Sequence, residues 1–212
     1  MQLIVITNEQ PLKREHDLLH ALFEEGLEVL HIRKPYYTLY ELESYLEDIN
    51  PSFYNRISVH RMPDIIERFP LRGYHFSYDA FKKDNRDLQL INKFRQSNRL
   101  VSCSCHSVED LKTAKEITDY QFISPLFDSI SKSGYKAGID LNELSKFLRE
   151  HNATTLGLGG IDEKTISSLK NTGLKGVVVL GMIWKQFAED ADIKKAVQRF
   201  TLLRETIAEG AQ

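Results

Sequence analysis

The sequence predicts a single α/β domain that spans residues 1–212 and folds as a (β/α)8 TIM barrel. Eight short runs rich in β-branched and apolar residues follow one another along the chain, and stretches with helical apolar periodicity separate most of them. The last two runs close on glycine. Strands that alternate with helices pair in parallel through right-handed crossovers. Eight such units favour a closed barrel over the alternative, an open sheet of five or six strands.

The expected strands cover almost the whole chain. They are residues 3–7, 29–33, 56–60, 73–77, 100–106, 120–127, 154–160 and 176–182. Apolar helical stripes lie between them, from Leu18, Leu19, Leu22 and Phe23 to Ile193, Val197, Phe200 and Leu203. Ser107 and Asp162 each precede acidic residues, as helix N-caps do. The connection from 61 to 72 contains Pro63 and Pro70, so the third helix is expected to be short.

Charge and composition exclude several classes of partner. The chain has 28 basic and 30 acidic side chains and a net charge of −2, which offers no electrostatic footprint for nucleic acid or an anionic membrane. No apolar run approaches the ~20 residues of a membrane helix. The N-terminal MQLIVITNEQ lacks a basic region and a cleavage site and fits a strand. Cys103 and Cys105 are expected to be reduced and buried, and a cytoplasmic location is the default expectation.

Polar residues gather at the predicted carboxyl ends of the strands, where barrels carry their active sites. Four of the seven histidines lie there, together with an arginine, serines and a lysine. These candidates are His31, His60, His75, His106, Arg33, Ser104, Ser129, Ser131 and Lys132. Residues two apart in a strand share a face, so His31 lies with Arg33, and Ser104 with His106. The mouth is therefore expected to be polar and cationic, which suits a phosphorylated small molecule.

The histidines allow two kinds of chemistry. Neutral imidazole is a good zinc ligand, but these four come from four different strands without a matching carboxylate, and histidines that form hydrogen bonds in a core are commoner. We therefore expect no metal ligands among them. Any of the four has a suitable unperturbed pKa for acid or base catalysis, and position alone does not choose between them.

Three segments are suited to holding phosphate. TTLGLGGI (154–161) and GVVVLGMIW (176–184) each contain a short apolar run that closes on glycine, which lets backbone N–H groups approach an anion closely. The alternative for both is a buried strand with a glycine turn. DSISKSGYKAG (128–138) is rich in serine, lysine and glycine, and suits a lid over a phosphate or diphosphate. The alternative for that loop is an ordinary solvated connection.

Several motifs, in register, resemble the thiamine phosphate synthase family, which includes the thiazole tautomerases. HIRKP (31–35) is similar to the family's Gln-Leu-Arg-x-Lys, and GYHF (73–76) to its Gly-Val-His-Leu. SCSCHS (102–107) resembles Gly-x-Ser-x-His-Ser, and SPLFDSISK (124–132) resembles Gly-Pro-Ile-Phe-x-Thr-x-Thr-Lys. LGLGGI and GVVVLGMI correspond to the closing phosphate loops. The resemblance covers nearly the whole chain.

The resemblance implies that an aminopyrimidine diphosphate loses magnesium-bound diphosphate while a thiazole phosphate attacks the exposed methylene carbon. Arg33 and Lys132 would hold diphosphate, with hydroxyl donors at Ser104, Ser129 and Ser131. The thiazole phosphate would bind backbone at Gly159, Gly160, Leu180 and Gly181. His31 and His106 complete the expected catalytic set, and His60, Arg61 and His75 the substrate-binding set. Relatives of this kind also allow a homo-oligomer.

The chain departs from the family at the expected Mg²⁺ ligands. His60 and Arg61 replace an Asn-Asp pair, and Ala80 replaces a second aspartate, with Asp79 one residue early. The usual carboxylates are therefore expected to be absent, unless a gapped alignment restores Asp64 or Asp79. The family's strand-two lysine aligns with Pro35, while Lys34 would point to the opposite face.

These departures leave three functional hypotheses. The leading one is thiamine phosphate synthase coupling, because Pro125, Ser129, Ser131 and Lys132 suit diphosphate departure. The second is proton transfer on a carboxythiazole phosphate by His31, His60 or His106, although Pro125 stands where tautomerases of this kind carry a histidine. The third is a binder of thiamine intermediates without catalysis.

Overall fold

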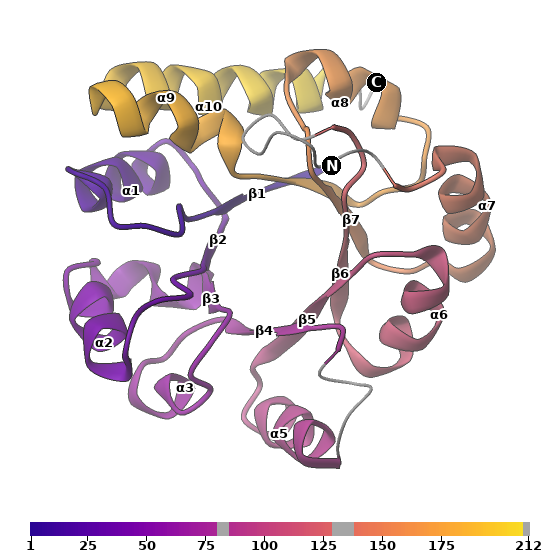
Figure 1. Ribbon diagram of the computed structural model, residues 1–212, viewed down its shortest axis with the longest axis horizontal. Coiled ribbons are helices and arrows are strands. Elements are labelled where there is room, and N and C mark those ends of the chain that lie inside the picture. Colours follow the sequence, from indigo (N-terminus) through magenta and orange to yellow (C-terminus); the bar gives the residue numbers. More distant parts are fainter. Residues whose placement is uncertain (80–84, 129–137, 210–212) are drawn as a thin grey trace.

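The chain folds as a closed barrel of parallel strands, which confirms the predicted fold class (Figure 1). The computed structural model describes residues 1–79, 85–128 and 138–209. Its strands follow one another around the barrel in chain order. They are β1 (Gln2–Ile6), β2 (Val29–Ile32), β3 (Ile57–Val59), β4 (Gly73–Ser77), β5 (Leu100–Cys105), β6 (Tyr120–Ile123), β7 (Thr155–Leu158) and β8 (Gly176–Val179).

Helices form a ring around the strands (Figure 1). They are α1 (Glu15–Glu24), α2 (Leu39–Glu47), η1 (Pro51–Arg56), α3 (Ile65–Arg68), α5 (Asn85–Gln96), α6 (Val108–Ile117), α7 (Leu141–His151), α8 (Glu163–Leu169), α9 (Gly181–Asp190) and α10 (Ile193–Ala208). The predicted caps are confirmed, since Ser107 accepts from the N–H of Asp110 and Asp162 forms a capping box with Thr165. The short third helix is also confirmed: α3 has 4 residues.

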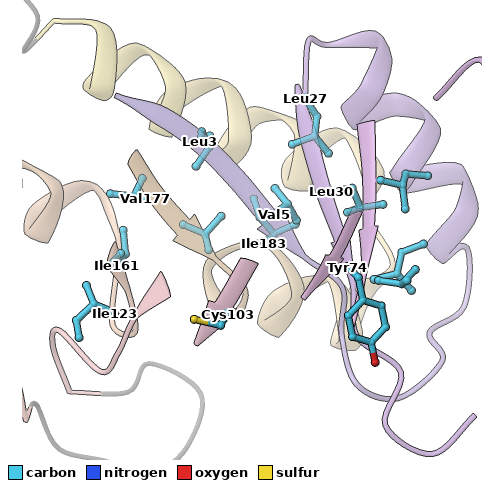
Figure 2. Packing of buried hydrophobic residues seen from close by; sticks show 14 of the residues in the cluster. Leu3, Val5, Leu27, Leu30, Tyr74, Cys103, Ile123, Ile161, Val177 and Ile183 are labelled. Carbon is cyan, nitrogen blue, oxygen red and sulfur yellow. The ribbon is translucent and has the colours of Figure 1, made fainter. Parts of the chain in front are cut away.

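Alternating side chains divide the core into two layers. Inside the barrel, Ile4 and Ile6 of β1 pack with Val29, Tyr120, Phe122, Leu156 and Val178. Leu3 and Val5 of the same strand point outward and join the larger cluster beneath the helices, where Figure 2 also shows Leu30 and Val177. This period of two is the strand geometry on which the predicted faces depend. It places His31 and His75, which share their parity with inward neighbours, inside the barrel.

Several predicted strands extend too far at their carboxyl ends, and the differences are largest at β6 and β8. β6 stops at Ile123, because Pro125 has no N–H with which to continue the ladder. β8 stops at Val179, and Gly181 and Met182 belong to α9 instead. The apolar run GVVVLGMIW spans both elements, so apolar content alone did not separate the strand from the helix. The first correction places residues 124–127 in the loop at the mouth of the barrel, and the second leaves Leu180 between β8 and α9.

The cysteines lie where their parity in the strand predicts. Cys103 and Cys105 are free thiols, both fully buried in the outer layer, with 3.8 Å between their Sγ atoms (Figure 2 shows Cys103). Among the described residues, no helix combines the length and the apolar character needed to cross a membrane. The expected cytoplasmic location stays a prediction.

Candidate active site at the carboxyl end of the barrel

A cavity of about 1070 Å³ opens where the strands end. Its wall includes most of the predicted site residues. These are Arg33, His60, Arg61, His75, Ser104, His106, Gly159, Gly160, Leu180 and Gly181. His31 is fully buried and does not line the cavity wall. The predicted Ser129, Ser131 and Lys132 lie outside the described residues.

A chain of hydrogen bonds leads from the cavity into the barrel. His60 follows β3 and lines the cavity, and its Nε2 lies 3.0 Å from Nδ1 of His31 on β2. The other nitrogen of His31, Nε2, lies 2.8 Å from the hydroxyl of Tyr120 on β6. That hydroxyl is 3.5 Å from Ser58 Oγ. Sequence reasoning missed Tyr120 as a member of the site, although its parity with inward-facing Phe122 was a usable signal.

His75 forms the second part of the histidine cluster. Its Nδ1 and Nε2 each lie 2.8 Å from a serine hydroxyl, Ser102 and Ser104 respectively. Its ring stacks on that of His60, with 4.2 Å between the ring centroids. His31, His60 and His75 thus meet at the floor of the cavity, although they come from three different strands or strand ends.

The cluster is held in its neutral state. Burial places the pKa of His31 well below its usual value, and the neighbouring His75 and Arg72 lower this pKa further. Burial and the nearby His75, His31 and Arg33 lower the pKa of His60 in the same direction. Burial, followed by Arg33, lowers the pKa of His75 to about 3. At neutral pH these rings therefore donate or accept hydrogen bonds without carrying charge.

His106 stands apart from this cluster. It follows β5 and is exposed, and its Nδ1 lies 3.0 Å from the carbonyl oxygen of Ser124, to which it donates. Its backbone N–H donates to Asp110 Oδ2 over 2.8 Å. These bonds fix the ring at the rim of the cavity and leave Nε2 as the nitrogen with acceptor capacity.

Two arginines supply positive charge to the wall. Arg33 pairs with Glu9, and its backbone N–H donates to Thr7 Oγ1 over 2.9 Å. Arg61 donates to the carbonyl oxygen of Pro35. Sequence reasoning missed Glu9, whose position three residues after β1 was its only signal. Glu9 and Asp87 also line this wall, so the two arginines are balanced by two carboxylates there, and the predicted cationic mouth is not confirmed by the described residues.

Lys34 points away from the cavity, as the strand parity predicts. Its Nζ lies 2.7 and 2.8 Å from the two carboxylate oxygens of Glu15 on α1, and both side chains are buried. The same carboxylate accepts from the hydroxyl of Tyr45 over 2.8 Å and from the N–H of Leu12 over 3.1 Å. This buried ion pair anchors the β1–α1 loop, which carries Glu9.

The glycine loops have the backbone conformation that glycine favours. Gly159 has φ +100° and Gly160 has φ +65°. A Cβ at Gly160 would lie 2.4 Å from the carbonyl oxygen of Asp128 and 2.6 Å from Cβ of Phe127. The loop after β7 therefore packs directly against the loop after β6, and a side chain would separate them.

The first turn of α9 faces the same cavity. Its N-cap residue, Leu180, makes no side-chain cap, and both Leu180 and Gly181 line the cavity wall. The first N–H groups of a helix have no acceptor within the helix, and the helix dipole adds favourable potential for an anion. This arrangement can hold a phosphate by backbone donors.

The described residues do not fit a magnesium ion held by paired carboxylates. In this part of the chain, Glu9 and Asp87 are the carboxylates of the cavity wall, and Glu9 is paired with Arg33. Asp64 precedes α3 and Asp79 is exposed, and neither lines the cavity. Mg²⁺ prefers oxygen ligands in octahedral geometry, which neutral histidines and arginines do not supply. The gapped alignment thus brings no carboxylate into the site.

Comparisons with known proteins agree with this architecture. A family model described as Thiamine monophosphate synthase matches residues 3–183. The thiamine-phosphate synthase of Ruminiclostridium cellulolyticum is 31% identical over 111 residues, which are 52% of this chain and 50% of that protein. The corresponding Lactococcus lactis subsp. lactis protein is 29% identical over 118 residues, 55% of this chain and 53% of its own. The chain thus spans about half the length of the curated relatives it matches.

Solved structures extend the likeness to the whole barrel. A thiamine phosphate pyrophosphorylase from Bacteroides thetaiotaomicron superposes with a TM-score of 0.75 at 31% identity, over 97% of each chain. One from Pyrococcus furiosus has a TM-score of 0.76 at 19% identity, over 100% of this chain and 97% of that one, and shows the fold alone. With the match of the family model over residues 3–183, these findings show that the chain belongs to the thiamine monophosphate synthase family.

Proposed function

We propose that this chain is a transferase of thiamine biosynthesis that couples an aminopyrimidine diphosphate to a thiazole phosphate. One observation supports this most directly. A single cavity combines two arginines, Arg33 and Arg61, with the glycine loop after β7 and the uncapped start of α9. Such a cavity offers separate places for a leaving diphosphate and for a monophosphate ester.

The arginines act on the leaving group. An electron-rich pyrimidine stabilises the cation that develops as the C–O bond to diphosphate breaks, and fixed positive charges stabilise the departing anion. Arg33 and Arg61 supply that charge from the wall formed by the loops after β2 and β3. Lys132, Ser129 and Ser131, which lie outside the described residues, are proposed to assist.

The backbone holds the second substrate. Amide groups around Gly159 and Gly160 and at Leu180 and Gly181 are proposed to bind the thiazole phosphate, with the uncapped α9 adding its dipole. Neutral His60 and His75 and the hydroxyl of Ser104 would orient the organic rings by hydrogen bonds without adding charge. Binding both substrates in one cavity brings the thiazole nitrogen to the exposed methylene carbon.

No step of this proposal runs through Mg²⁺, because the described donors do not fit it. Arg61 stands where the family resemblance places a carboxylate, and it offsets diphosphate charge directly. The test is a coupling assay with both precursors, with and without Mg²⁺. Formation of thiamine phosphate supports the proposal, and failure under both conditions by folded protein refutes it.

The same assay separates the other hypotheses. Metal-independent isomerisation of a carboxythiazole phosphate that depends on one histidine would identify a proton-transfer enzyme instead. Tight binding of thiazole phosphate with neither activity would identify a non-catalytic binder. A Lys132→Ala variant should lose coupling turnover and still bind thiazole phosphate, whereas Lys146→Ala on α7 should retain both. A homo-oligomer remains a prediction.

A further inference from the structure

The histidine cluster at the floor of the cavity brings three ring nitrogens close together. His31, His60 and His75 each offer one ring nitrogen, and these three nitrogens all lie within 4.8 Å of one another. Among the residues the structure describes, this is the one group of three or more histidine, cysteine or acidic side chains so arranged. TIM-barrel interiors are ordinarily filled by branched apolar side chains. Three imidazoles in one place are therefore a departure from ordinary barrel packing.

We propose that His31, His60 and His75 form a binding site for one divalent transition-metal ion of the zinc class. This proposal does not rest on the coupling activity. Two of the nitrogens, His31 Nδ1 and His60 Nε2, are 3.0 Å apart. Zinc–nitrogen bonds of about 2.0–2.1 Å in a tetrahedral site need nitrogens only a few tenths of an ångström further apart. Rotation of these two rings would direct both lone pairs at one ion, and His75, whose ring stacks on that of His60, would have to turn with them.

The surroundings of the cluster are those of a metal site. Metal-binding histidines donate their other N–H to a hydroxyl, carbonyl or carboxylate, which fixes the ring and its tautomer. His31 Nε2 lies 2.8 Å from the hydroxyl of Tyr120, and so can donate to it while Nδ1 faces His60. His75 has a serine hydroxyl 2.8 Å from each nitrogen. One hydroxyl can rotate away to free a ligand nitrogen while the other keeps the ring in place.

Metal binding would release no proton from the two facing rings. In the hydrogen bond between His31 and His60, one of the two facing nitrogens carries the proton. When both bind the ion, that proton moves to the opposite nitrogen of its own ring, so both rings stay neutral and no proton is released. The imidazoles are already uncharged, and binding therefore does not require their deprotonation.

The donor set selects the class of ion. Imidazole suits Zn²⁺, Ni²⁺, Cu²⁺ and Co²⁺, whereas Mg²⁺ prefers carboxylate and water oxygens. Three protein ligands leave a fourth position, and His60 and His75 line the cavity, so that position opens toward bound molecules. Arg33 adds positive charge nearby and is paired with Glu9. A water or an anionic oxygen from a cavity ligand would complete the coordination.

Cobalt titration tests the site without reference to activity. Full-length protein without an affinity tag is freed of metal with a chelator and titrated with Co²⁺, whose visible absorption distinguishes tetrahedral from six-coordinate ions. We expect saturation at one Co²⁺ per chain, an intense tetrahedral spectrum, and displacement by Zn²⁺. An anomalous scattering peak between the three rings in crystals grown with Zn²⁺ would locate the ion.

Variants give the test its controls. Tyr120→Phe removes an outer hydrogen bond and should weaken binding about 10- to 100-fold. His60→Ala removes a ligand from the cavity side and should weaken it further, while His151→Ala, on the exposed end of α7, should leave it unchanged. If His60→Ala does not fold, as judged by circular dichroism, His60→Gln takes its place. Absence of saturable binding, a six-coordinate spectrum, or equal binding by wild type and the folded His60 variant would overturn the proposal.

Discussion

Gly160 and Gly138 differ sharply in the space around them, and this difference gives a stringent test of the phosphate loop. Replacement of Gly160 by alanine places a Cβ 2.4 Å from the carbonyl oxygen of Asp128, at a residue whose φ is +65°. The left-handed conformation costs an L-residue about 1–2 kcal/mol. Relief of the overlap with the neighbouring loop adds about 1–3 kcal/mol. The variant should therefore lose about 2–5 kcal/mol of unfolding free energy.

Gly138→Ala is the matched control. Among the described residues other than Gly138 and its chain neighbours, no heavy atom lies within 4 Å of the added Cβ, and its φ is not in the left-handed region. This variant should stay within about 0.5 kcal/mol of wild type. Urea unfolding can be followed by the fluorescence of Trp184, the only tryptophan, which is buried and donates to the carbonyl oxygen of Ile6 over 2.6 Å. Titration with thiazole phosphate on the same samples measures binding.

The two measurements together decide the outcome. Gly160→Ala should be less stable and should bind thiazole phosphate more weakly at temperatures where it remains folded, because the loop after β7 moves away from that after β6. Gly138→Ala should change neither property. A Gly160→Ala protein with wild-type stability and affinity would refute the argument that the two loops and the anion site depend on each other.

Three further predictions concern charge. Lys34→Ala strands the Glu15 carboxylate in the core and should cost about 3–5 kcal/mol in urea unfolding; a loss below about 1 kcal/mol would contradict the buried ion pair. The pKa values of His31 and His75 are lowered in the folded chain. Below about pH 6.5 these histidines therefore become protonated in the unfolded chain before they do so in the folded chain. The unfolding free energy should fall toward acid pH by about 1.4 kcal/mol per pH unit for each histidine. His75→Gln should remove the contribution of His75 to that slope. Arg61→Ala should raise the KM for the pyrimidine diphosphate about 10- to 100-fold in steady-state kinetics, and an unchanged KM would show that Arg61 does not bind it.

The fold and the facing of individual side chains could be predicted from the sequence because both depend on local periodicity. Arg33 and Lys34 directly follow β2 and continue its period of two, which separates Arg33, at the cavity, from Lys34, in its ion pair with Glu15. The caps at Ser107 and Asp162 are equally local, since each side chain bonds to a backbone only two or three residues away.

The contacts inside the site could not be predicted in the same way, because they join distant parts of the chain. His31 meets the hydroxyl of Tyr120 across 89 positions, and the distance depends on the register of strands between them. The partnership of Arg33 with Glu9 depends on the course of a loop. The start of α9 at Gly181 could not be located from the sequence, because β8 and α9 share one apolar run. Register and loop conformation are properties of the closed barrel and are not visible in any short segment.

A crystal structure with thiazole phosphate bound would show whether the loop after β7 and the start of α9 hold the phosphate. We expect the phosphate to lie between the backbone amides near Gly160 and those at the first turn of α9, beginning at Gly181, with the thiazole ring directed toward His60 and His75. Phosphate density at another part of the wall, or its absence at saturating ligand, would contradict it.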